Sequence, residues 1–501
     1  MRLKQFSGKL LLIPVAVGTL LCSCMEPTDE KNTLTVDPES SFTYDINGNV
    51  SFFDSTLEED KDNDEKEFKK KITINFNGAA KPTIEPAETE GVEIDNSEKG
   101  EAHLIIKSSE KINYVLKGKS TEGSLMIFSQ KKFKLTLDNL ELSNDAGVPA
   151  ISSQTKKRCF IETVGTATIK DAQSYSLPEA YKIKDANGEY VLENDRKIAY
   201  YDAKGAIFSE GEIIFCGNGT LNVEGRTKHA IASDQYVRLL SGTVNVTGSK
   251  KDGIHTNDAV LINGGKLDIS GIVVTDPNKD VKKFNGIECE KGYIVIMDGK
   301  IDITSPGIGI YASKEEFVEK DAMTEKSFIY IDGGKIDIKT TETKGHGINS
   351  MSHMIIKGGE INIQALGESA KGLRTDFNKV EDEKEVENGN ITLTGGTINI
   401  FCVDKALDPE GKLNILGGTI NAIGGDCFER TQILAGSKPC GIATFDSPIT
   451  VGEEIYFESE KVGTVRATLN KAYAVFVKDG LVAGATPEVK IGSQKVKADV
   501  K

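Results

Sequence analysis

Residues 334–338 read Gly-Lys-Ile-Asp-Ile, and variants of this five-residue unit recur from residue 219 onward. Each unit is a glycine, any residue, an aliphatic residue, Asn or Asp, and then an aliphatic residue or alanine. The units begin at Gly219, Gly242, Gly265, Gly299, Gly334, Gly359, Gly396 and Gly418. Their starts are 22 to 25 residues apart, except where three insertions of about ten to fifteen residues lengthen the spacing. Self-similarity at a period of this length predicts a stack of structural repeats.

Each repeat contains two further short apolar segments. One is centred on a Gly-Ile pair or its equivalent, as at Asp252-Gly-Ile, and the other is an alternating run such as Ser327-Phe-Ile-Tyr-Ile. We name these the second and third strands of a repeat, after the first strand that follows each glycine. Three short strands of period two per repeat fit one coil of a parallel β-helix in an all-β protein. With weaker coils at 133–142, 159–169 and 206–215, we expect roughly a dozen coils, which at about 4.8 Å each form a rod of about 55 Å.

The remaining sequence divides the chain into four parts. Residues 1–23 are typical of a lipoprotein signal peptide, because a basic start is followed by a short apolar run at 10–21 and by Leu-Cys-Ser-Cys at 21–24. This tetrapeptide resembles a lipobox, which predicts cleavage before Cys24 and lipidation of its thiol; an ordinary secretory signal with an incidental cysteine is the alternative. We expect residues 24–71 to be a tether, 72–446 the parallel β-helix, and 447–501 a small C-terminal β cap.

The acidic residues after Cys24 resemble the export tag of Bacteroidetes surface lipoproteins. They predict an outer-membrane protein that is exposed at the cell surface and contacts the membrane through its lipid alone. The formal net charge of −15 argues against nucleic acid as a partner, because phosphate binding needs clustered Lys and Arg. The charge run at 57–71 is expected to be solvated. Cys427 and Cys440 could form a disulfide, whereas no Cys-x-x-Cys pair supports a zinc site.

Aligning the repeats places outward-facing residues in columns along the rod. The first-strand column contains Asn222, Asn245, Asp268, Asp302, Asp337, Asn362, Asn399 and Asn421. Its stacked carboxylates could form a row of calcium sites. Lys266, Lys300 and Lys335, however, stand two residues before the three aspartates on the same face. We therefore expect a solvated ion-pair face there, with the charge compensated without a metal.

The outward column of the second strands differs from coil to coil. It reads Ala232, His255, Glu288, Tyr311, Asn349, Arg374, Asp408 and Glu429. An extended ligand laid along the rod would explain such variety, although an ordinary surface would also permit it. His229 and His346 precede this strand several coils apart, and we expect both to be exposed turn residues.

The repeats also resemble a known family. The Gly-Gly-x-Ile-x-Ile units, the Lys-Asp-Gly-Ile turn at 251–254, and Gly-Asn-Gly-Thr-Leu at 217–221 are similar to those of the carbohydrate-binding parallel β-helix family, which includes a clostridial cellulose- and pectin-binding protein. The resemblance covers about residues 110–430. It implies a right-handed parallel β-helix like that of pectate lyases, bound calcium, and binding of plant-type or acidic polysaccharide. By the family's turn pattern, the calcium candidates are Asp252, Asp404 and Asp426; the matching positions His229, Asn285, His346 and Lys371 depart from it.

We therefore expect a surface lipoprotein that binds a polysaccharide, pectin-like if acidic, with the help of calcium and without catalysis. The expected sugar contacts are Glu288, Tyr311, Arg374 and Asp408. The chain has no Trp, which argues against a flat aromatic platform. One alternative is an adhesin or structural surface rod. Another is a polysaccharide lyase, in which a cation acidifies a proton next to a uronate carboxylate and Lys405 or Arg374 removes it, near Asp404 and Asp408.

Overall fold

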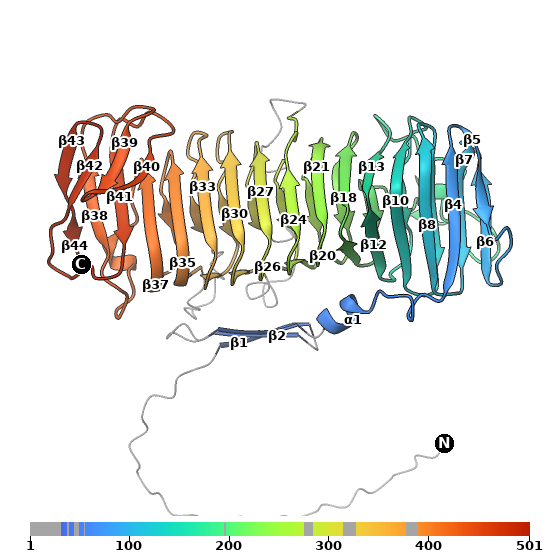
Figure 1. The fold of residues 1–501 in the computed structure, drawn as a ribbon, viewed down its shortest axis with the longest axis horizontal. Helices are drawn as coiled ribbons and strands as arrows, with labels where there is room; N and C mark the ends of the chain where they lie inside the picture. Colours follow the sequence, from blue (N-terminus) through green and yellow to red (C-terminus); the bar gives the residue numbers. More distant parts are fainter. Residues whose placement is uncertain are drawn as a thin grey trace, which may run out of the picture.

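The computed structural model describes residues 32–37, 40–44, 50–54, 56–194, 197–274, 284–313, 327–376 and 389–501, with side chains from residue 54 onward. The described chain is nearly all β. Figure 1 shows the strands lying side by side along a rod, from β6 (Val92–Ser97) at one end to β44 (Asp499–Val500) at the other. The strands of successive repeats pair in parallel, and the expected coils are therefore found as a stack of three-strand repeats.

The second strands form most of a 12-stranded sheet in the described chain, whose order is β36-β34-β31-β28-β25-β22-β19-β16-β11-β9-β7-β6. Neighbours from β7 to β36 pair in parallel. The bounds are β6 (Val92–Ser97), β7 (Gly100–Ser108), β9 (Ser124–Ser129), β11 (Ile151–Ser153), β16 (Gly205–Ser209), β19 (His229–Ser233), β22 (Ile254–Thr256), β25 (Ile287–Cys289), β28 (Ile310–Ala312), β31 (Ile348–Ser350), β34 (Leu373–Thr375) and β36 (Leu407–Asp408).

The third and first strands form the other two faces of the rod. The third strands are β8 (Ile112–Ser120), β10 (Phe133–Ser143), β12 (Cys159–Val164), β17 (Ile213–Gly217), β20 (Tyr236–Leu239), β23 (Ala259–Ile262), β26 (Tyr293–Ile296), β29 (Ile329–Ile331), β32 (Met354–Ile356), β35 (Ile391–Cys402) and β37 (Leu413–Gly424). The first strands are β13 (Thr166–Lys170), β18 (Thr220–Gly225), β21 (Thr243–Ser249), β24 (Lys266–Ile269), β27 (Lys300–Ser305), β30 (Lys335–Thr340) and β33 (Glu360–Ala365). The long strands β10, β35 and β37 continue from third-strand into first-strand pairing.

The recurring unit explains both the turn and the core. Gly334 and Gly359 have φ values of +87° and +91°, a region that L side chains rarely adopt. The aliphatic positions that follow point inward, so that Ile336, Ile361 and Ile398 are neighbours in register and at most 1% exposed. These ladders join into one continuous core that runs from Ile72 to Val477. Burying it requires neighbouring coils, since a single coil leaves its apolar edges open.

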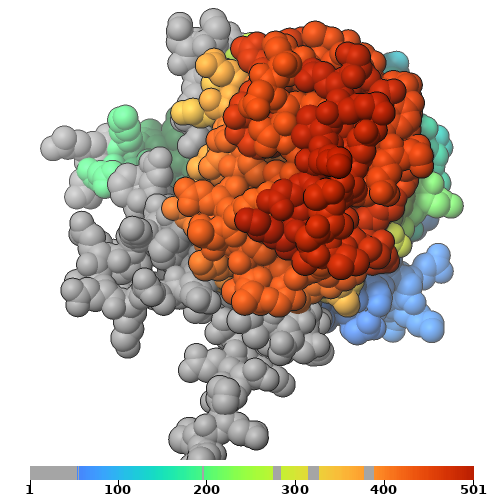
Figure 2. All heavy atoms as spheres, turned by 90° about the vertical axis from the view of Figure 1, so that its left-hand side faces the viewer, coloured from blue at the N-terminus to red at the C-terminus, as the bar shows by residue number. Residues whose placement is uncertain are grey.

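Antiparallel strands close both ends of the rod. At the N-terminal end, β4 (Lys70–Asn77) pairs with β5 (Ala80–Glu85), and β6 pairs with β7. At the C-terminal end, β41 (Ala472–Val477) lies antiparallel to β37 and β38 (Gly441–Phe445), so the cap includes residues before the expected boundary at 447. Figure 2 shows this module covering the end of the rod. Its remaining elements are η3 (Arg430–Gln432), β39 (Glu454–Phe457), β40 (Glu460–Thr464), β42 (Glu488–Ile491), β43 (Gln494–Lys497) and β44 (Asp499–Val500).

The expected tether contains ordered elements. An antiparallel sheet comprises β1 (Asn32–Asp37), β2 (Ser40–Tyr44) and β3 (Val50–Phe53), and helix α1 spans Leu57–Lys61. Asp60 of α1 is fully buried, and its carboxylate accepts a 2.5 Å hydrogen bond from the fully buried Arg238 of β20. Arg158 lies 2.8 Å from the same carboxylate. The expectation that the whole run at 57–71 is solvated is therefore wrong at Asp60, because buried cations on the third-strand face need an anionic partner.

The insertion at 170–204 covers part of the second-strand sheet. It contains η1 (Glu179–Tyr181), β14 (Leu192–Glu193) and β15 (Lys197–Ile198), and Tyr181 packs in a small core with Met126 of β9. All six cysteines in the described ranges are free thiols, so Cys427 and Cys440 are not joined. Within those ranges, no helix has the length and apolar character needed to span a membrane.

Candidate functional site

The four expected sugar-contact residues lie in one column on the outer face of the second-strand sheet. The strand register pairs Glu288 with Tyr311 directly, and continues through Asn349 to Arg374 and then Asp408. All four expected residues are half-buried. The structure therefore brings them into a continuous row, which we call the second-strand row; it runs from His255 of β22 to Asp408 of β36.

A His–Asp–His cluster occupies one end of this row. Asp252 Oδ2 lies 3.2 Å from His229 Nδ1 and 3.1 Å from His255 Nδ1, and the two imidazole rings stack with centroids 4.3 Å apart. The backbone N–H of Asn285 donates a 2.8 Å hydrogen bond to Asp252 Oδ1. His229 is only 5% exposed and His346 only 3%, so the expectation of exposed turn histidines is wrong for both. Both rings lie against polar groups: His229 against Asp252, and His346 against Arg374 and the backbone N–H of Lys371.

The two histidines of the cluster differ in protonation state. Burial, helped by the positive charge of His255, lowers the pKa of His229 to about 3. Burial also opposes charge on His255, but hydrogen bonds to Asp252 and Glu290 outweigh it and raise the pKa of His255 to about 10. Burial opposes the charge of Asp252 as well, yet its hydrogen bonds to both imidazoles hold its pKa below the usual range. At neutral pH the cluster thus contains one imidazolium paired with one carboxylate.

Glu288 adds a group that titrates near neutrality. Burial raises the pKa of Glu288 to about 8, and the negative charge of Asp252 contributes to the same shift. Its two oxygens are already held, since Asn285 Nδ2 donates to Oε2 at 2.9 Å and Ser313 Oγ donates to Oε1 at 2.9 Å. The carboxyl is therefore fixed in position before any ligand arrives.

The middle of the row is organised around Arg374. Its guanidinium forms an ion pair with Asp376, whose Oδ2 also accepts a 3.1 Å hydrogen bond from Asn349. His346 Nε2 lies 3.3 Å from Arg374 Nη1, and His346 Nδ1 accepts a 3.1 Å hydrogen bond from the backbone N–H of Lys371. These contacts fix a planar cation on the outer face of β34.

The far end of the row is a network of lysines and aspartates. Lys371 Nζ lies 2.8 Å from Asp404 Oδ2 and 3.1 Å from Asp408 Oδ2, and Lys405 Nζ lies 3.3 Å from Asp408 Oδ1. Burial opposes the charge of Lys371, but its bonds to Asp404 and Asp408 outweigh burial and raise its pKa. These contacts hold Lys371 as a charged ammonium between two carboxylates.

The three calcium candidates differ in their surroundings, whereas Ca²⁺ prefers a shell of six to eight oxygens. Asp252 faces two imidazoles, and Asp404 faces the ammonium of Lys371. Asp426 is exposed, and its Oδ1 accepts a 2.8 Å hydrogen bond from the N–H of Cys427. None of these three contact sets is an oxygen-rich shell, so Asp252, Asp404 and Asp426 each lack the surroundings that Ca²⁺ prefers. The set of His229, Asp252 and His255 has the nitrogen and oxygen donors of a borderline transition metal.

Sequence reasoning missed the partnership of His229 with Asp252. The signal was present, because both residues precede the Gly-Ile or Ala-Ile pair of adjacent second strands. Such positions lie about 4.8 Å apart along a stack, which is close enough for side chains to meet. Cys24, the expected lipidation site, lies outside the described residues.

A family model described as a carbohydrate-binding domain-containing protein matches residues 100–324 and 317–429. The chain belongs to this carbohydrate-binding family. The match begins with β7 and ends before β38, so it spans the second-strand row and stops short of the cap. No match was found among curated proteins.

A solved structure titled as the polysaccharide lyase-like protein from C. thermocellum, a gadolinium derivative, is similar to this chain at 18% sequence identity. The similarity covers 63% of this chain and 98% of that one, with a TM-score of 0.38.

Proposed function

We propose that the protein is a cell-surface lipoprotein that binds a polysaccharide along the second-strand row without cleaving it. The observation that carries the proposal is the coincidence of that row with the family match: polar and charged side chains continue in register from His255 to Asp408 inside the matched residues. We also propose that the rod winds as a right-handed parallel β-helix and that Cys24 carries the lipid anchor.

The geometry suits an extended polymer better than a small ligand. Outward residues recur about every 4.8 Å along the rod, so a chain laid across the strands meets a new side chain at each coil. Glu288, Arg374 and Asp408 are each held by neighbouring polar groups. Prior fixing of this kind reduces the entropy lost when a sugar binds.

The lyase alternative has less support from the same contacts. Lys405 and Arg374, the bases considered for it, both form ion pairs with aspartates, at Asp408 and Asp376 respectively. Each of the two cations thus already has a carboxylate partner. Binding without cleavage therefore accounts better for the observed pairs.

A pull-down on immobilised polysaccharides tests the proposal. The chain from residue 25 onward, which contains every described residue, would be applied to polygalacturonate, cellulose and host glycosaminoglycans, with folding checked by circular dichroism. We expect retention by at least one polymer. We expect Arg374→Gln to weaken it about tenfold, because a charge-assisted hydrogen bond contributes about 1.5–3 kcal/mol.

The matched control is Lys266→Gln, which removes one positive charge from the first-strand face. Equal losses from Arg374→Gln and Lys266→Gln would contradict the placement on the second-strand row. Folded protein that no polysaccharide retains would contradict the function itself and favour the adhesin or structural rod. Release of an unsaturated product, followed by its ultraviolet absorbance, would contradict the absence of cleavage.

A further inference from the structure

A groove of about 310 Å³ lies where the first-strand face meets the C-terminal cap. One wall is the outer face of β30, β33, β35 and β37, and the other is formed by β39, β40 and the residues just after them. Phe401, Ile423 and Phe476 supply an apolar surface within it. Its volume falls at the lower end of the range for small-ligand sites, about 300–1,000 Å³. The groove lies on a different face of the rod from the second-strand row.

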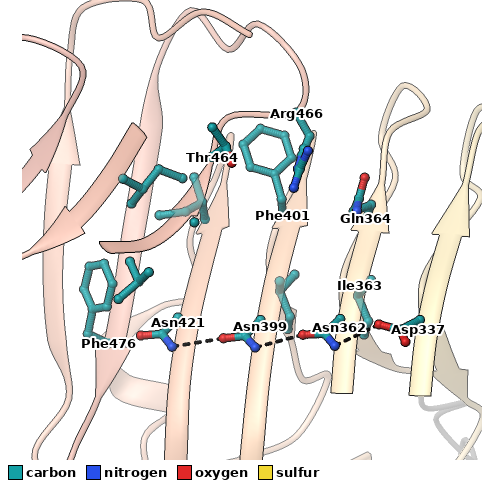
Figure 3. Close-up of a pocket in the computed structure, with 15 residues that line it drawn as sticks. Asp337, Asn362, Ile363, Gln364, Asn399, Phe401, Asn421, Thr464, Arg466 and Phe476 are labelled. Atoms are coloured by element: carbon teal, nitrogen blue, oxygen red, sulfur yellow. Dashed lines mark hydrogen bonds between the residues drawn. The ribbon is translucent and has the colours of Figure 1, made fainter. Parts of the chain in front are cut away.

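A ladder of side-chain amides runs along this groove, as Figure 3 shows. Asn421 Nδ2 donates to Asn399 Oδ1 at 3.0 Å, Asn399 donates to Asn362 at 2.8 Å, and Asn362 donates to Asp337 Oδ1 at 2.8 Å. All the bonds point in one direction. Because an amide nitrogen carries two N–H donors, Asn399 and Asn421 each use one in the ladder and keep a second for a ligand.

Two cations flank the ladder. Arg466 follows β40 on the cap side of the groove, and Figure 3 places its guanidinium beside the ring of Phe401. Lys339 of β30 pairs in register with Gln364 of β33, which pairs in turn with Phe401 of β35. Lys339 is therefore two strands away from Phe401. The side chains of Arg466 and Lys339 are both exposed, and within the described ranges neither forms an ion pair. The lysines farther along this face differ, since Lys300 pairs with Asp302 at 3.1 Å and Lys335 with Glu360 at 2.6 Å.

We propose that this groove is a second carbohydrate subsite, selective for an acidic sugar. The carboxylate of a uronate residue binds Arg466, its hydroxyls bind the remaining N–H donors of Asn399 and Asn421, and its apolar ring face packs near Phe401. Lys339 attracts the next acidic residue of the polymer. The inference rests on the proposed function, because it assumes a polysaccharide ligand. It adds the chemical class of the sugar and a second site, whose cap wall lies beyond residue 429, where the family match ends.

Calorimetric titration with two probes tests the inference on the chain from residue 25 onward. The probes are trigalacturonate and its methyl ester, which has the same rings without the charges. We expect wild-type protein to bind trigalacturonate at least tenfold more tightly than the ester. Arg466→Gln should remove most of this difference, since it deletes the cation and keeps a polar side chain.

Lys497→Gln is the matched control, because Lys497 is an exposed cation of the cap on β43, outside the groove. A second variant, Gly463→Leu, fills the groove without changing the charge. A Cβ at Gly463 would meet only Ile455 Cδ1 within 4 Å, at 3.7 Å, so the backbone accepts a side chain there. We expect this variant to weaken the binding of both probes about tenfold or more while its thermal midpoint stays near that of wild type.

The outcomes separate the two proposals. Loss of selectivity in Arg466→Gln but not in Lys497→Gln supports the subsite. Equal affinities of Arg466→Gln, Gly463→Leu and wild type for trigalacturonate overturn the subsite, while retention on polysaccharide columns still upholds the proposed function. Wild-type protein that binds both probes equally overturns the selectivity for acid. Wild-type protein that binds neither these probes nor any polymer overturns both proposals.

Discussion

Glu288 stands between groups of opposite charge, and this determines how its titration affects the fold. Burial and the charge of Asp252 raise its pKa to about 8, while the imidazolium of His255 opposes the shift. A carboxyl with a raised folded-state pKa contributes stability that is complete below its unfolded pKa of about 4.5 and is lost as the pH rises through 8. Part of the unfolding free energy should therefore disappear between pH 5 and pH 8.

Glu288→Gln should remove that part, because glutamine resembles the protonated carboxyl and is neutral at every pH. Between pH 5 and pH 8 we expect wild type to lose on the order of a few kcal/mol more than the variant, measured by urea unfolding. The pKa of His255 is raised to about 10, which adds a separate loss of unfolding free energy from about pH 6.5 to pH 10. Glu288→Gln should show this second loss as wild type does. Glu122→Gln, at an exposed glutamate, is the control. Identical pH profiles for wild type and Glu288→Gln would show that Glu288 does not titrate in this range.

The turn before β33 depends on glycine for two separate reasons. Gly359 has φ of +91°, and a Cβ there would lie 2.9 Å from the carbonyl oxygen of Gly334 in the preceding coil. Gly452 in the cap has nearly the same φ, +92°, with nothing within 4 Å of its Cβ position. Comparing substitutions at Gly359 and Gly452 therefore separates the cost of backbone strain from the cost of the clash between coils.

We expect Gly452→Ala to destabilise the protein by about 1 kcal/mol, from the left-handed backbone alone. Gly359→Ala should cost at least about 1–2 kcal/mol more, because the coils must also move apart. Denaturant unfolding of the two variants measures the difference. Equal losses would mean that the spacing between coils relaxes freely around an added methyl group.

Helix α1 is held to the third-strand face by buried charges. Asp60 and Arg238 are both fully buried, and Arg238 also pairs with Asp54 at 2.8 Å. Removing one member of such a pair leaves the other uncompensated in a buried place. Asp60→Ala should therefore lower the unfolding free energy by about 3 kcal/mol, or release α1 so that a protease cleaves beside it.

Glu58→Ala, on the same helix, provides the comparison because the Glu58 side chain is exposed and its ion pair with Lys61 is on the surface. We expect a change within about 0.5 kcal/mol for it. Limited proteolysis detects the release of α1, and urea unfolding measures the loss of unfolding free energy. An Asp60→Ala variant as stable and as protease-resistant as Glu58→Ala would show that α1 is not anchored by this pair.

At two places along the stack, lysines compensate the charge of aspartates that calcium could otherwise bind. Lys371 occupies the position beside Asp404, and Lys266, Lys300 and Lys335 accompany the aspartate column. We expect the thermal midpoint to be the same in millimolar calcium and in EGTA. A clear fall of the midpoint in EGTA would contradict this expectation, since a ligand bound to the folded state raises its stability by mass action.

The repeats predicted the stack because each inward residue meets its own counterpart one coil away. The columns from Asn222 to Asn421 and from Ala232 to Asp408 follow the structural register. What the sequence could not supply was contact between segments outside the repeat. The groove joins β35 to residues that follow β40, and the Asp60–Arg238 pair joins residues 178 apart.

The anchoring of α1 at β20 also determines how the rod would be presented at a cell surface. Figure 1 shows α1 beside the long flank of the rod, from where the chain continues to β4 at one end. With the lipid that we propose on Cys24, only 54 − 24 = 30 residues separate the membrane from Asp54, a reach of at most about 100 Å. The chain would then join the rod at its flank and not at either end. The second-strand row and the cap groove lie away from the third-strand face that α1 contacts, so this attachment would leave both open to a polymer.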